Sequence, residues 1–254
     1  MKRIAFAASA LAAVIALSLS ALVSPAYPGP FTNGDFETPT VPIGNFTLFA
    51  TGSTSITGWT VVGPTGGNVA VVSGTFTQFD NGINFIFPAQ SGVQWLDLTG
   101  ISNTPGEGVS QTVTTIPGDA YRVSFFVGNV SDPGGIFGTT STVNVQVGGS
   151  TIFTAENSMV PPNVAGNQTM LYQQFTTTFV ASSTSTALAF LNGDPSTDTS
   201  NGLDNITLTD LGPTPVPGPI VGAGLPGLIL AGGVLLALAR RRRAASDCRS
   251  NRDL

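Results

Sequence analysis

The chain has 254 residues, which is enough for one or two domains, and its 9 basic and 14 acidic residues give a net charge of −5. It contains no histidine and one cysteine, so the sequence excludes Ser-His-Asp catalysis, histidine-bound zinc and an internal disulfide. Between residues 4 and 239, twelve acidic residues accompany a single basic residue, Arg122, and this balance argues against nucleic acid and anionic membrane surfaces as partners.

Residues 1–26 have the three parts of a secretory signal peptide. Lys2 and Arg3 form the basic start, residues 4–23 are apolar or small, and Ser24-Pro25-Ala26 places small residues where signal peptidase cuts. We therefore expect cleavage before Tyr27 and export of the chain to the cell surface or beyond. The alternative is an uncleaved membrane anchor.

Residues 27–211 show short alternating runs of apolar and polar residues instead of a helical period. Turn-forming combinations of Gly, Pro, Asn and Asp separate these runs. The predicted strands are 58–62, 69–73, 92–98, 109–115, 121–128, 141–147, 151–155, 172–180, 186–192 and 203–209. This pattern predicts one all-β domain, a two-sheet sandwich of the jelly-roll type.

The stretch 76–87 contains four phenylalanines and has two interpretations. It is either a pair of strands or a loop that covers the core. In both cases we expect most of its aromatic side chains to fill the core, because aromatic residues are usually buried.

The two ends of the predicted domain carry short motifs. Residues 33–37 read NGDFE and residues 202–208 read GLDNITL. Between them lie four more segments in the same order: ITGW at 56–59, QWLDL at 94–98, GVSQT at 108–112 and YRVSF at 121–125. Together they resemble galactose-binding-like jelly rolls, a group that includes carbohydrate-binding modules and DUF642-type wall proteins. Asn205 departs from the resemblance, because that group often has a second acid there.

The resemblance also implies a structural calcium ion. In such modules the opening Glu and the closing Asp help to hold Ca²⁺, which makes Glu37 and Asp204 candidate ligands here, with Asp35 as a weaker one. Calcium takes 6–8 oxygen ligands, and backbone carbonyls supply part of them. The alternative is that Glu37 and Asp204 are solvated or capping acids.

Sugar binding calls for flat aromatic side chains that stack on pyranose rings. We name Trp59 and Tyr172 as candidates. Trp95 and Tyr121 lie inside alternating strands, which favours core packing for both.

The sequence favours a protein without catalytic activity. It has no GxSxG, P-loop or metal-hydrolase motif, and pairs of carboxylates are too common among twelve acids to indicate a glycosidase. A secreted carbohydrate-active hydrolase is the alternative, together with a purely structural adhesion domain.

The C-terminal part predicts a membrane segment. Residues 212–219 form a Pro-rich, extended linker, and residues 220–239 carry no charge over 20 residues, long enough to span a bilayer core of about 30 Å. The next four residues are Arg240, Arg241, Arg242 and Arg243. By the positive-inside rule they keep the tail 240–254 in the cytoplasm and the domain outside. A plain single-span anchor is the simpler interpretation.

A proline motif, an apolar helix and a basic cluster in this order resemble the PEP-CTERM sorting signal of Gram-negative bacteria. The motif here consists of Val216, Pro217, Gly218 and Pro219, followed by VGAGLPGL at 221–228. A literal Pro-Glu-Pro is absent, and the chain continues for eleven residues after the arginines. The resemblance implies transient anchoring in the inner membrane and cleavage by an exosortase near the motif, often in association with exopolysaccharide. The sequence thus predicts a surface or matrix protein that binds or organises polysaccharide.

Overall fold

A computed structural model describes residues 31–214, 234–235 and 237–238. The chain divides into two compact units, residues 1–212 and 213–254. In the second unit Val234, Leu235, Ala237 and Leu238 are helical. No helix in the described part of the chain is long and apolar enough to cross a membrane. The predicted signal peptide, sorting motif and arginine cluster, and most of the predicted membrane segment, lie outside the described residues.

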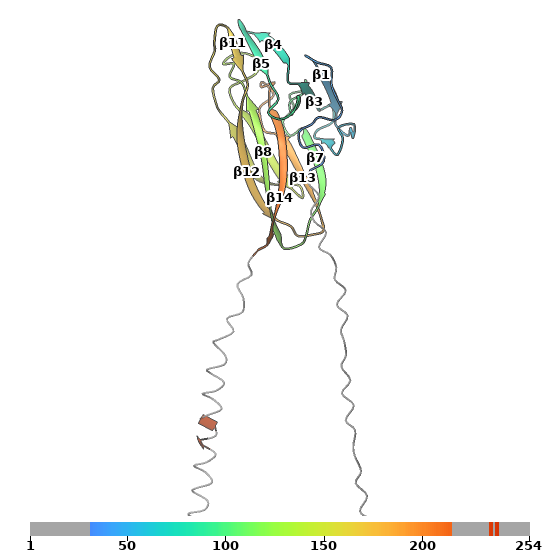
Figure 1. The fold of residues 1–254 in the computed structure, drawn as a ribbon, viewed down its shortest axis with the longest axis vertical. Coiled ribbons are helices and arrows are strands. Elements are labelled where there is room, and N and C mark those ends of the chain that lie inside the picture. The colour runs from blue at the N-terminus through green and yellow to red at the C-terminus, as the bar shows by residue number, and fades with distance from the viewer. Residues whose placement is uncertain (1–30, 215–233, 236, 239–254) are drawn as a thin grey trace, which may run out of the picture. The chain divides into compact units, whose positions relative to one another are not determined.

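Residues 31–214 form fourteen strands and no helix (Figure 1). The first seven are β1 (Phe46–Ala50), β2 (Thr60–Val62), β3 (Asn68–Ser73), β4 (Phe76–Asp80), β5 (Ile83–Phe87), β6 (Gln94–Asp97) and β7 (Gly108–Thr114). The remaining seven are β8 (Asp119–Asn129), β9 (Ser141–Val147), β10 (Ser150–Asn157), β11 (Asn167–Thr169), β12 (Leu171–Val180), β13 (Ser185–Asn192) and β14 (Gly202–Pro213). The expectation of an all-β domain is therefore confirmed.

The strands form three sheets. Sheet A has the order β1-β3-β6-β14-β8-β12, sheet B the order β10-β9-β13-β7-β2, and sheet C the order β11-β5-β4. In Figure 1, β12, β8 and β14 run side by side, and β4 and β5 lie at the upper end of the domain. The last strand, β14, thus lies in the middle of the largest sheet.

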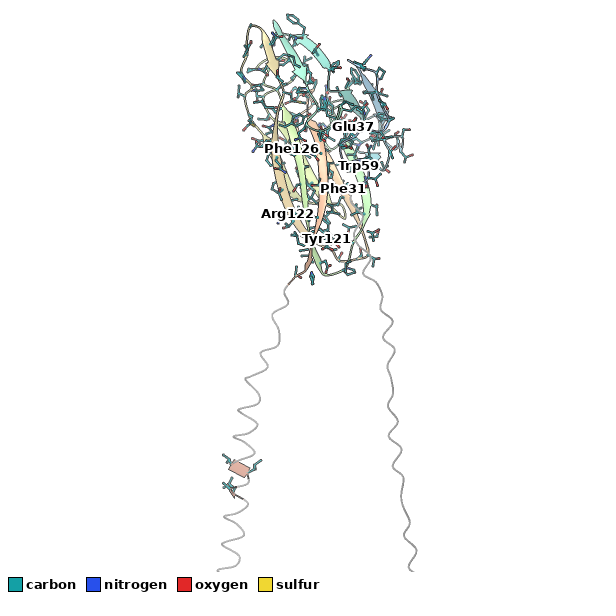
Figure 2. The ribbon with its side chains drawn as sticks, in the orientation of Figure 1. Phe31, Glu37, Trp59, Tyr121, Arg122 and Phe126 are labelled. Atoms are coloured by element: carbon teal, nitrogen blue, oxygen red, sulfur yellow. The ribbon has the colours of Figure 1, made fainter. Side chains whose placement is uncertain are left out.

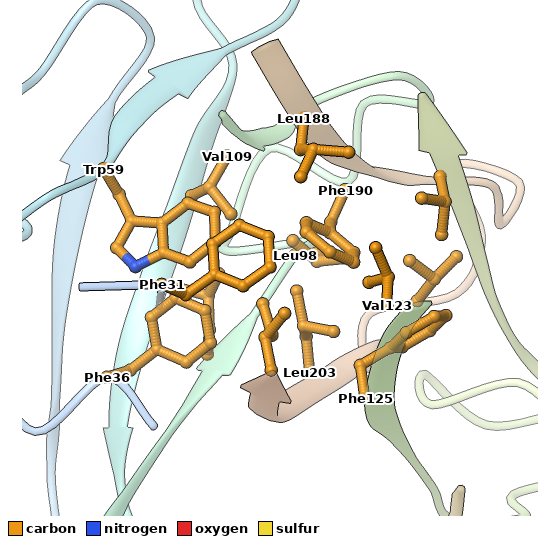
Figure 3. Close-up of a cluster of buried hydrophobic side chains, with 14 of the residues drawn as sticks. Phe31, Phe36, Trp59, Leu98, Val109, Val123, Phe125, Leu188, Phe190 and Leu203 are labelled. Carbon is orange, nitrogen blue, oxygen red and sulfur yellow. The ribbon is translucent and has the colours of Figure 1, made fainter. Parts of the chain in front are cut away.

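The main core contains inward-facing side chains of sheets A and B. On β8 the alternating residues Tyr121, Val123, Phe125 and Val127 are fully buried, as period-two alternation predicts. From sheet B, Phe190 of β13 meets Phe125 with ring centroids 5.4 Å apart, in an edge-to-face contact (Figure 3). This packing of two sheets over a shared apolar layer confirms the sandwich-like arrangement.

Sheet A also has apolar residues on its opposite face. Val69 and Val71 of β3 belong to the main core, whereas the intervening Ala70 and Val72 belong to a second cluster with Trp95 of β6 and with phenylalanines of sheet C. A strand that is covered on both faces needs a continuous apolar run, and VAVV at 69–72 supplies it. Sheet C therefore adds a small third layer that the sequence had not predicted.

An irregular segment, residues 31–41, ties the start of the domain to its last strand. The backbone N–H of Ile206 donates to the carbonyl of Gly34 at 2.8 Å. A Cβ atom at Gly34 would lie 2.2 Å from the carbonyl oxygen of Ile206, so only glycine fits there. The side-chain amide of Gln94 in β6 donates to the carbonyls of Phe36 and Pro39 and accepts from the N–H of Val41. The opening and closing motifs therefore meet in space.

All ten predicted strands are present, with boundaries that shift by a few residues. The Phe-rich stretch 76–87 is a strand pair, β4 and β5, which settles the two interpretations in favour of strands. Strand β1 and the three-residue strand β11 were not predicted from the sequence.

Candidate functional site

A pocket of about 240 Å³ lies between sheet C and the outer face of sheet A. We call its aromatic lining the wall and its polar lining the floor. The aromatic wall consists of Phe46, Phe76, Phe87, Trp95 and Phe137. The polar lining consists of Gln78, Asp97, Asn103, Thr199 and Ser200. An apolar cavity with a few convergent polar groups has the make-up of a small-molecule site.

The aromatic wall is ordered by ring–ring contacts. Phe87 and Trp95 stack with ring centroids 5.9 Å apart and an angle of 20° between their planes. Phe76 packs beside Phe87 at 5.8 Å and edge-on against Phe46 at 5.6 Å. The indole N–H of Trp95 donates to the carbonyl of Phe87 at 3.2 Å, so Trp95 is fixed from both sides. Phe87 and Trp95 are 2% exposed and support the wall, whereas the half-buried Phe46 and Phe76 are the rings that a ligand could reach.

Asp97 lies at the polar floor, at the end of β6. Its partners across the sheet are Ala70 on β3 and Gly202 on β14, and these small residues leave space beside the carboxylate. Oδ1 accepts hydrogen bonds from the N–H and hydroxyl of Thr99, at 3.0 and 2.7 Å, and from the N–H of Asn201 at 3.2 Å. None of the described residues donates to Oδ2.

Burial raises the pKa of the Asp97 carboxyl to about 7, opposed by the hydrogen bonds from Thr99 and Asn201 and reinforced by the charge of Glu107. Two more buried acids belong to the same acidic group, both from the loop between β13 and β14. Burial raises the pKa of Asp194 to about 7, and burial together with the charge of Asp194 raises that of Asp198 to about 8. Acids with shifted pKa values beside a pocket are a frequent mark of functional sites.

Two further polar atoms of the lining are buried without a partner. They are Oδ1 of Asn103 and the hydroxyl of Ser200. A buried polar atom without a hydrogen bond costs about 1–3 kcal/mol, so native proteins rarely leave such atoms unpaired.

The two predicted sugar-binding aromatics lie elsewhere. Trp59 is 1% exposed in the main core, where its ring stacks on Phe31 at 5.5 Å and its N–H donates to the carbonyl of Asn33 (Figures 2 and 3). Tyr172 packs against the second cluster, and its hydroxyl donates to the carbonyl of Pro88 at 3.0 Å. In this structure neither ring lines the pocket.

Two of the three predicted calcium ligands, Glu37 and Asp204, accept hydrogen bonds from the same segment, residues 90–94. Oε1 of Glu37 accepts the N–H groups of residues 93 and 94 at 2.7 and 2.9 Å, and Oδ2 of Asp204 accepts those of residues 90 and 91 at 2.8 and 3.0 Å. Burial raises the pKa of Asp204 to about 7, with a smaller contribution from the charge of Asp35.

Within the described residues no three His, Cys, Asp or Glu side chains are grouped so that they could hold a metal ion. The hydrogen bonds to residues 90–94 already occupy one oxygen each of Glu37 and Asp204, while Oε2 of Glu37 accepts no hydrogen bond from a described residue. Calcium at this place stays a prediction.

Asp97 was not among the predicted site residues, although it lies in the QWLDL motif at 94–98. Thr99, two residues away, donates two of its hydrogen bonds, but the third comes from Asn201 in the loop between β13 and β14. The one local signal was an acid that directly follows the apolar pair Trp95-Leu96.

The fold and the pocket define a sandwich-like β-protein with a lined cavity between two of its layers. The chain belongs to the DUF642 family, described as a protein of unknown function, which matches residues 29–208. No curated protein matches the sequence.

Three solved structures illustrate what the fold is similar to. A cyclase from Fischerella sp. TAU in complex with 4-(1H-indol-3-yl)butan-2-one is 18% identical, with 75% of this chain and 100% of that chain covered and a TM-score of 0.49. The CBM22-1 xylan-binding domain from Paenibacillus barcinonensis Xyn10C is 16% identical, with coverages of 67% and 97% and a TM-score of 0.38. A family 35 carbohydrate-binding module from an environmental isolate is 18% identical, with coverages of 51% and 82% and a TM-score of 0.35. Neither the identities nor the TM-scores support a transfer of activity.

Proposed function

We propose that this chain is an exported, non-catalytic protein whose jelly-roll domain binds a glycan in the pocket between sheets A and C. The observation that carries the proposal is the pocket itself, because aromatic and polar side chains line it together. Sugar rings use both features, because their C–H faces pack on aromatic rings while their hydroxyls hydrogen-bond to polar groups. Its volume suits about one sugar ring, so we expect recognition of a single residue within a polysaccharide.

Binding is favoured over hydrolysis by the acids of the lining. Glycoside hydrolysis needs a pair of carboxyl groups on either side of the scissile bond. Among the described residues that line the pocket, Asp97 is the one acid. The pocket thus lacks the pair of acids that a glycosidase needs. A secreted hydrolase is the second candidate, and hydrolysis assays on any glycan that binds would identify it.

The destination of the protein is part of the proposal. We propose that an exosortase processes the chain near Val216–Pro219 after export and that the domain then serves at the cell surface or in the extracellular matrix. The support comes from the sequence alone: the signal-peptide pattern at residues 1–26 and the motif, apolar segment and arginines at the C-terminus.

A glycan array tests the proposal when it is probed with the protein and two variants of β4. Phe76 lines the pocket, whereas Phe79 on the same strand is 71% exposed and lies outside the lining. We expect Phe76→Ala to lose glycan binding and Phe79→Ala to keep it, with circular dichroism as the check that both fold. Loss of binding in Phe79→Ala alone would move the site to the open surface of sheet C. Failure of the unaltered protein to bind any glycan would refute the proposed function.

A further inference from the structure

The polar part of the lining offers one carboxylate oxygen without a partner. None of the described residues donates to Oδ2 of Asp97, and an ionised carboxylate oxygen accepts hydrogen bonds. A ligand that brings an N–H or O–H donor can fill this place.

The ionisable groups around Asp97 are all acids. Glu107 acts on Asp97, and Asp97 acts in turn on Asp194 and Asp198. No ion pair is found among the described residues, and the one base between residues 31 and 214, Arg122, is exposed on β8, below Glu37 in Figure 2 and far from the upper end where β4 and β5 lie. A bound cation would supply the positive partner that keeps the Asp97 carboxyl ionised.

The aromatic wall is suited to a cation as well. Phe46 and Phe76 are its half-buried rings, and the buried Phe87 and Trp95 support them. Aromatic faces attract ammonium groups, tryptophan most strongly, and the attraction grows where water is excluded. A neutral sugar would pack on the same wall but leave the buried carboxylate without a charge partner, and an acidic sugar would be repelled.

We propose that the pocket selects a protonated amine, so that its glycan is one that contains amino sugars with free amino groups. This inference rests on the proposed function, because it names the class of glycan that the same pocket takes. The ammonium group donates to Asp97 Oδ2, and the sugar ring lies along Phe46 and Phe76. Hydrogen bonds between charged partners are roughly twice as strong as neutral ones, so the amine dominates the selection.

Calorimetry with three trisaccharides, of glucosamine, N-acetylglucosamine and glucose, tests the inference on the full chain in detergent and EDTA. We expect the glucosamine trisaccharide to bind about tenfold or more tightly than the other two. Asp97→Asn keeps the shape of the side chain but removes its charge, and it should abolish this preference. Glu156→Gln removes one negative charge at an exposed position of β10 and should leave the preference intact.

The dependence on pH separates a charge contact from a merely structural role of Asp97. Because the carboxyl takes up a proton near neutral pH, the affinity for the glucosamine trisaccharide should fall as the pH is lowered from 7 to 5. The same titration of Asp97→Asn should show no such fall. A wild-type affinity that does not change between pH 7 and 5 would contradict the charge contact.

Three results would overturn the inference. Equal affinity for all three trisaccharides, with loss in Phe76→Ala, would leave the proposed function standing but refute the amine. Absence of binding for all three would refute both. Calcium chloride added without EDTA is the third probe, because binding of Ca²⁺ to the wild type but not to Asp97→Asn would make the floor a metal site instead.

Discussion

Asp198 should make the domain less stable as the pH rises. It is 3% exposed, its Oδ1 accepts the N–H of Ser200 at 3.2 Å, and burial and the nearby charges of Asp194 and Asp97 raise its pKa from 3.8 to about 8. Between these two pH values the folded state holds a proton that the unfolded state has released. Stability is therefore greatest at the acidic end of this window and is lost as the pH rises through it.

The replacement Asp198→Asn removes this proton linkage. One proton corresponds to about 1.4 kcal/mol of unfolding free energy per pH unit. Between pH 5 and 7 the stability of the variant relative to the wild type should therefore rise by roughly 3 kcal/mol in total. The amide keeps an oxygen for the N–H of Ser200, so the loop keeps its hydrogen bond.

Urea unfolding of the full chain at pH 5, 6 and 7 measures this difference. Glu156→Gln, at an exposed position, is the control and should change the slope against pH much less. A difference between Asp198→Asn and the wild type that stays constant from pH 5 to 7 would refute the reasoning, because Asp198 would then be ionised equally in both states.

Three further predictions concern the sequence motifs. Trp59→Phe should lower the melting temperature, since it removes the hydrogen bond to Asn33 and leaves a gap in the core, but it should not change glycan affinity; a loss of affinity in a folded variant would restore Trp59 as a sugar contact. Calcium should bind with measurable heat and raise the melting temperature, and Glu37→Gln should weaken both effects. If calcium gives no heat of binding and neither calcium nor EDTA changes the melting temperature, the calcium site is refuted. The intact mass of the protein recovered from cells should correspond to a chain of about 27–217, and a mass that still includes residues 220–254 would indicate a plain membrane anchor.

Local patterns predicted most of the sheets but not the third layer. Strands with clear alternation, such as β8 and β9, were visible because each buries one face. β11 consists of the three residues NQT, and it is a strand only because it pairs in parallel with β5, more than eighty residues earlier. The sequence of three residues cannot predict a strand that depends on pairing with so distant a segment.

The candidate site was less visible for a similar reason. The alternating strand around Trp95 predicted core packing for that residue, and Trp59 was the predicted sugar contact. Both are buried, Trp59 between Phe31 and Phe36 and Trp95 beside the cavity, and the place of the cavity arises only when the sheets stack. Asp97 gains its role from the loop 193–201, which reaches it from the far end of the sequence.

The position of β14 in sheet A has a consequence for the order of events during synthesis. The ribosome delivers β6 and β8 early, but the strand that lies between them comes last, at the C-terminal end of the domain. Until residue 202 and its successors emerge, the sheet is two separate pieces, and contacts between such distant segments form slowly. We propose that this chain crosses a membrane unfolded, and the late synthesis of β14 keeps its largest sheet from forming before export.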